Sequence, residues 1–68
     1  SLEQAARLYW SAADNGNTGA MVQLAKLLRA GDGVPKDETA ALRWLQLAAD
    51  EGNNEALDLL ENRSESPS

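Results

Sequence analysis

Four stretches of the chain carry apolar residues at every third or fourth position, the spacing that gathers side chains on one face of an α-helix. The expected helices cover residues 2–15, 18–30, 38–51 and 54–62. In the first and third helices, the predicted apolar faces hold Leu2, Ala5, Leu8, Tyr9, Ala12 and Ala13, and Ala41, Trp44, Leu45, Ala48 and Ala49, respectively. In the second and fourth, they hold Ala20, Met21, Leu24, Leu27 and Leu28, and Ala56, Leu57 and Leu60.

The residues between these stretches are typical of helix ends. Asparagine, aspartate and serine side chains accept hydrogen bonds from the first free N–H groups of a helix, and glycine adopts the left-handed conformation that ends one. N-caps are therefore expected at Ser1 (with Gln4 as a capping-box partner), Asn17, Asp37 and Asn53, and helix stops at Gly16 and Gly52. Two glycines and a proline predict a loop over residues 31–36.

The chain repeats itself at an offset of 36 residues. The segment AADNGN at 12–17 recurs as AADEGN at 48–53, and further identical pairs fall into register at the same offset. Such a period is typical of stacked helix-turn-helix units. We therefore predict one unit at 1–36, a second, truncated unit at 37–63, and a flexible polar tail at 64–68. The first helix of each unit is termed the A helix and the second the B helix.

Composition supports an all-α fold. Alanine and leucine make up about a third of the residues, and β-branched residues are few. The two helices of each unit are joined by a turn of only two or three residues, so they must lie close together. Small side chains at the crossing allow this close approach. Four alanines are therefore expected where the helices cross: Ala12, Ala13, Ala48 and Ala49.

The second unit resembles a known family in its helix pattern, its turn glycine and its connector. The residues that carry the resemblance are Asp37, Ala41, Trp44, Leu45, Ala48, Ala49, Gly52 and Ala56, together with the loop GDGVPKD at 31–37. They resemble the Sel-one-like repeats, which are relatives of the tetratricopeptide repeats. Ala25, Leu28 and Leu8 depart from the family's usual residues. The resemblance implies a right-handed α-α superhelix of two repeats and four helices that acts as a scaffold for protein assembly. The family by itself is not an enzyme class.

Charge and side-chain chemistry exclude several functions. The net charge of −5 argues against binding to nucleic acid or to anionic lipid. No apolar run approaches the roughly 20 residues of a membrane span. The absence of cysteine and histidine removes thiol chemistry and zinc sites. The remaining acidic pairs, such as Asp14 with Asp50, are better explained as residues near helix ends, so we expect no catalysis, metal or cofactor.

The most promising binding residues lie on the A helices, off the predicted apolar faces. They form two rows in the same helical phase: Arg7, Trp10, Ser11 and Asp14, and Arg43, Gln46, Leu47 and Asp50. The two arginines could bind a partner or pair with acids on their own helices. Trp10 fits either a partner contact or a surface covered by a preceding repeat, whereas Trp44 is expected in the core.

Leu57 and Leu59 on the last helix are candidate edge contacts that would allow self-association. We therefore expect a module that binds a protein or peptide. The sequence leaves open two alternatives, a non-catalytic accessory domain of a larger enzyme or envelope-associated protein and a structural spacer. The sequence does not indicate a cellular compartment. Because the chain begins with Ser1, it is expected to be part of a longer protein.

Overall fold

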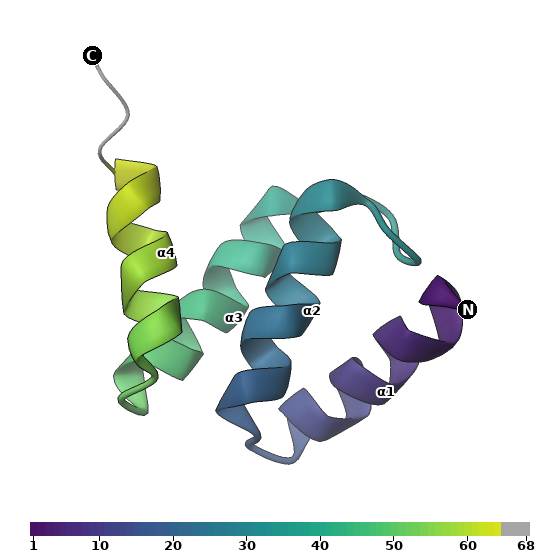
Figure 1. Cartoon of the computed structure of the whole chain (residues 1–68), viewed down its shortest axis with the longest axis horizontal. Coiled ribbons are helices and arrows are strands. Elements are labelled where there is room, and N and C mark those ends of the chain that lie inside the picture. Colours follow the sequence, from purple (N-terminus) through teal and green to yellow (C-terminus); the bar gives the residue numbers. More distant parts are fainter. Residues whose placement is uncertain (65–68) are drawn as a thin grey trace.

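The computed structural model describes residues 1–64 as four α-helices. They are α1 (Leu2–Asp14), α2 (Thr18–Ala30), α3 (Glu38–Asp50) and α4 (Asn54–Ser64). Consecutive helices run in opposite directions and pack against one another, and no strand occurs in this part of the chain (Figure 1). The predicted all-α helical repeat is confirmed. Of the predicted tail, Ser64 is the last residue of α4, and 65–68 lie outside the described residues.

The helices begin at the predicted caps. The side-chain oxygens of Ser1, Asn17, Asp37 and Asn53 accept hydrogen bonds, at 2.9–3.2 Å, from the backbone N–H three residues later. Gly16 and Gly52 follow α1 and α3 with φ of 92° and 93°, the left-handed conformation expected of them. Local sequence therefore sets the helix boundaries to within two residues.

The core lies where α2 and α3 face each other, and its largest fully buried side chains are Val22, Leu24 and Leu45. Ala13 and Ala48 are buried in this core, while Ala12 and Ala49 are half-buried against it. Trp44, expected in the core, is half-buried and packs against it.

The predicted apolar face of α1 is wrong at three residues. Leu2, Leu8 and Tyr9 are 56%, 71% and 36% exposed. The buried residues of this helix are Ala6 and Ala13. Among the described helices, α1 packs extensively against α2 alone, so α2 covers only one edge of the broad apolar stripe. Leu59 is the reverse case. It was not placed on the predicted apolar face of α4, yet it is half-buried against the core.

Polar contacts tie α2 to the helices that follow it. Asn53 donates a hydrogen bond from Nδ2 to the Thr18 hydroxyl at 3.2 Å, which joins the start of α4 to the start of α2. Lys26 forms an ion pair of 2.7 Å with Glu55 of α4. Arg29 lies 3.6 Å from Glu38 at the start of α3. These contacts add polar links between the second unit and the first, beside the apolar core.

The connector at residues 31–37 folds back towards the start of α1. Gly33 has φ 76°, and a Cβ at this position would stand 2.6 Å from the carbonyl carbon of Leu2. At the other end of the connector, the Asp37 N–H donates to the Leu28 carbonyl at 2.8 Å. A glycine is therefore required at position 33 both for its backbone angle and for its closeness to α1.

We expect Ala48→Leu to destabilise the fold by about 1–3 kcal/mol, because Ala48 has no exposed surface and the larger side chain would overpack the core around it. Urea unfolding followed by circular dichroism measures the change. Ala30→Leu, at an exposed position at the end of α2, is the control and should be nearly neutral. Equal stability of the two variants would contradict the buried packing of Ala48.

Candidate functional site

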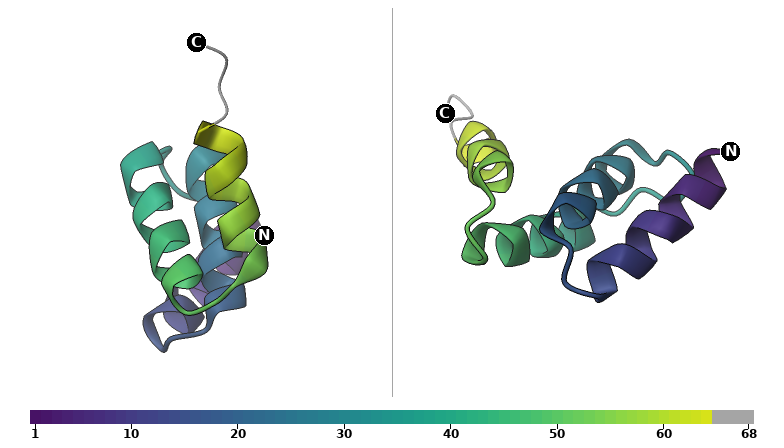
Figure 2. Two further views of the ribbon diagram at one scale, coloured as in Figure 1. Left: turned by 90° about the vertical axis from the view of Figure 1, so that its left-hand side faces the viewer. Right: turned by 60° about the horizontal axis from the view of Figure 1, so that its bottom comes forward.

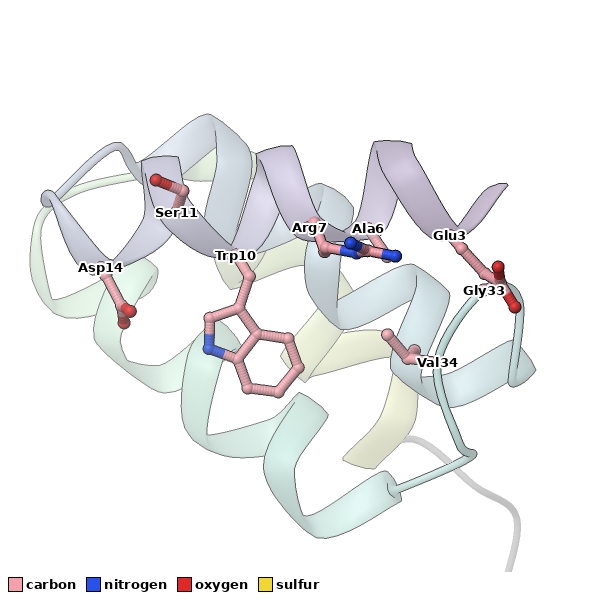
Figure 3. Close-up of a pocket in the computed structure, with 8 residues that line it drawn as sticks. All are labelled: Glu3, Ala6, Arg7, Trp10, Ser11, Asp14, Gly33 and Val34. Carbon is pink, nitrogen blue, oxygen red and sulfur yellow. The ribbon is translucent and has the colours of Figure 1, made fainter. Parts of the chain in front are cut away.

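A groove of about 650 Å³ lies between α1 and the connector (Figure 3). It opens to solvent along the side of α1 that carries the first predicted row of binding residues. All four members of that row line it, and the full lining comprises Glu3, Ala6, Arg7, Trp10, Ser11, Asp14, Gly33 and Val34. The structure therefore brings the row Arg7, Trp10, Ser11 and Asp14 together in one concave surface.

Trp10 forms the apolar wall of this groove. Its ring meets that of Trp44 from α3 edge to face, with ring centroids 6.4 Å apart and an angle of 82° between the planes. The side chain remains 40% exposed and lies across the groove from Val34 (Figure 3). Neither interpretation of Trp10 from the sequence included this ring contact. It holds the indole in place while leaving part of its surface free.

The charged residues of the groove alternate along α1. Glu3 and Asp14 line it towards its two ends, and Arg7 lies between them (Figure 3). All three are exposed, and the Arg7 side chain forms no ion pair or hydrogen bond within residues 1–64. The alternative that Arg7 pairs with an acid on its own helix is therefore wrong for this structure. Its guanidinium donors remain available.

The second predicted row does not converge in the same way. Arg43 and Leu47 line a separate hollow of about 270 Å³, with Ala40 and Trp44. Leu47 is 48% exposed, and the Arg43 side chain, like that of Arg7, has no ion pair within the described residues. Gln46 donates from Nε2 to the Asp50 carboxylate at 3.1 Å, so these two residues bind each other. The two rows share helical phase, but only Arg43 and Leu47 of the second row line a hollow, and it is separate from the groove.

Four lining residues were missed by sequence reasoning: Glu3, Ala6, Gly33 and Val34. Gly33 and Val34 were interpreted only as parts of a loop. The two glycines and the proline predict that the connector turns, but they do not predict that it packs on the start of α1. That contact joins Gly33 to Leu2, which lie far apart in the sequence. The sequence held a weak indication of the Trp10–Trp44 contact, because two tryptophans on successive A helices can meet when those helices stack.

The sequence matches the model of the Sel1 repeat family at residues 1–17 and 18–53. These matches cover more than half of the chain. It belongs to the Sel1 repeat family. The second match spans α2, the connector and α3, and the first spans α1. No curated protein and no solved structure matches the chain.

Sel1 repeats are generally protein-interaction modules and are typically non-catalytic. Within residues 1–64 of this Sel1 repeat chain, no group of three or more His, Cys, Asp or Glu side chains is placed to hold a metal ion. No helix of the same residues has the length and apolar character needed to cross a membrane.

The two predicted edge contacts of the Sel1 repeat chain, Leu57 and Leu59, differ in how far they are exposed. Leu57 is 42% exposed on α4. Leu59 is half-buried and packs against the core. Only Leu57 of this pair therefore presents a large part of an apolar side chain outward, and self-association through this edge remains a prediction.

Proposed function

We propose that this chain is a protein-interaction module that holds an extended segment of a partner protein in the α1 groove. The observation that carries the proposal is that Arg7, Trp10, Ser11 and Asp14 line one groove, with Arg7 free of intramolecular partners within residues 1–64. The volume of about 650 Å³ falls within the range of sites that enclose sizeable ligands. The family's general role in protein interaction supports the same conclusion.

The groove offers two kinds of contact. Trp10, held by Trp44, is an apolar surface that loses little conformational freedom when a partner side chain packs on it. Arg7 presents a planar fork of donors suited to a carboxylate or to backbone carbonyls. Tryptophan and arginine are also the residues that most often dominate binding energy at protein interfaces. A segment with an apolar residue next to an acidic one fits this pair. The proposal assigns no catalytic role to the chain.

Peptides selected from a random display library on the immobilised chain provide the test. We expect Trp10→Ala and Arg7→Ala each to weaken the binding of the selected peptides by more than about fivefold, which corresponds to about 1 kcal/mol. Calorimetry on the purified variants measures the affinity. Thermal unfolding of each variant shows that the fold persists, since Trp10→Ala also removes the ring packing on Trp44.

Leu57→Ala is the matched control, because Leu57 is 42% exposed, close to the 40% of Trp10, but lies on α4. It should leave the affinity unchanged. Arg43→Ala tests separately whether the second row contributes, and a weaker affinity there would extend the binding surface to the neighbouring hollow. Full affinity in both the Trp10 and the Arg7 variants would place the binding surface on the B helices or the connector and contradict the proposal.

A further inference from the structure

The outward side of α1 is an apolar helix face that the other described helices cover only in part. Leu8 and Tyr9 are 71% and 36% exposed, and Ala5 and Ala12 beside them are half-buried. In Figures 1 and 2, α1 lies at one end of the row of helices and α4 at the other. A contiguous apolar face of this kind is typical of an interaction surface.

The same face is covered in the second unit. The residues 36 positions later are Ala41, Trp44, Leu45 and Ala48 of α3. Of these, Ala41, Leu45 and Ala48 are 0% exposed, and Trp44 is half-buried. The difference has a simple cause, since α3 packs against a helix on each side, α2 before it and α4 after it, whereas α1 packs extensively against α2 alone. The outward face of α1 therefore corresponds to the face of α3 that the preceding B helix covers.

A polar side chain at the start of α2 indicates the same missing neighbour. Asn53 caps α4 and also donates from Nδ2 to Thr18 of the preceding B helix. Asn17 occupies the equivalent position and caps α2 in the same way, but its Nδ2 has no hydrogen-bond partner among the described residues. Asn53 is half-buried and Asn17 is exposed. A B helix placed before α1 would bring a hydroxyl to Asn17 as Thr18 is brought to Asn53.

A second copy of this chain does not supply such a helix. In α2, which is covered on both sides, Val22 and Ala25 are 0% exposed. In α4 the equivalent residues are Asp58 and Glu61, which are exposed. Packing α4 of another copy against Leu8 and Tyr9 would desolvate the Asp58 carboxylate at an apolar surface, which is costly. The outer side of α4 instead has the polar character of a terminal, capping repeat.

We propose that the face of α1 formed by Ala5, Leu8, Tyr9 and Ala12 docks a B-type helix of a further repeat unit. This helix would be amphipathic, with small and branched apolar residues like Val22, Ala25 and Leu28 of α2 along one side, and with a hydroxyl at its start. The stack would thus extend from the outward face of α1. The inference is independent of the groove, because it rests on a different face of α1.

The test adds the missing helix to the full chain. A copy of residues 17–36 is joined directly ahead of Ser1, because Ser1 corresponds to Asp37, which follows the connector in the second unit. We expect the extended protein to melt at least about 4 °C higher than the chain itself, as added interface energy of about 1 kcal/mol does in a domain of this size. Amide hydrogen exchange across α1 should slow at the same time.

Two matched variants decide whether docking causes the gain. Val22→Asp and Ala25→Glu, made only in the added copy, reproduce the surface of α4 and should abolish the increase in melting temperature. Tyr9→Gln should reduce the gain while changing the unextended chain far less, a difference that a double-mutant cycle isolates. An equal gain with the charged copy, or no gain with the apolar copy, would overturn the proposal. So would sedimentation showing that the unextended chain forms a dimer and that Tyr9→Gln converts this dimer to monomers.

Discussion

Leu45→Ala is expected to leave most of the protein unfolded at 25 °C. Leu45 is 0% exposed and lies in α3 at the centre of the core shared by both units. Removing a fully buried leucine side chain costs about 2–5 kcal/mol, because the surrounding helices only partly collapse into the cavity. A domain of this size has a total stability of about 3–5 kcal/mol, so the loss is comparable to the whole.

The measurement is urea unfolding followed by the helical signal in circular dichroism. Leu47→Ala is the matched control, since it makes the same chemical change two residues later on the same helix, where the side chain is 48% exposed. It should alter the free energy of unfolding by less than about 0.5 kcal/mol. Similar losses of stability in the two variants would show that α3 presents a different face to the core.

Gly33→Ala is expected to destabilise the protein more than the same change at another left-handed glycine. Any L-residue pays about 1–2 kcal/mol for this backbone conformation. At position 33, a Cβ would also overlap the carbonyl oxygen of Leu2 and stand 2.6 Å from the carbonyl carbon. Since these are backbone atoms, the connector must move away from α1, which we expect to cost about 1–3 kcal/mol more.

Gly52→Ala separates the two contributions. Gly52 has φ 93°, but no atom lies within 4 Å of a Cβ built there, so this variant carries the backbone cost alone. Thermal and urea unfolding of both variants give the difference, and Gly52→Ala should be the more stable by more than about 1 kcal/mol. Equal stabilities would mean that the connector does not rest on the start of α1.

Sequence reasoning predicted the helices well because their boundaries are local. Each N-cap, at Ser1, Asn17, Asp37 and Asn53, acts on an N–H group three residues away, so a short window contains the whole interaction. The 36-residue period then assigned two units with the same helical phase. These features establish the repeat without any knowledge of tertiary contacts.

The same reasoning failed where a residue's surroundings depend on a neighbouring helix. Leu8 and Trp44 are equivalent in the repeat, but Trp44 is half-buried against the core and Leu8 is 71% exposed. Periodicity gives the direction of a side chain around its helix, not whether another helix lies there. For the candidate site, it aligned Arg7, Trp10, Ser11 and Asp14 correctly on one side of α1. It could not show that the connector closes the groove opposite them.

The position of α2 between α1 and α3 has a consequence for how the molecule opens. In a stack where each helix packs mainly on its neighbours in sequence, stability resides in the interfaces, and an end helix can detach by breaking one helix interface and a few further side-chain contacts. We therefore expect α1 or α4 to fray before the α2–α3 pair opens, since opening that pair separates the molecule into two short hairpins. The unfolding of this protein is thus expected to proceed from its ends inwards, with the α2–α3 pair as its last cooperative unit.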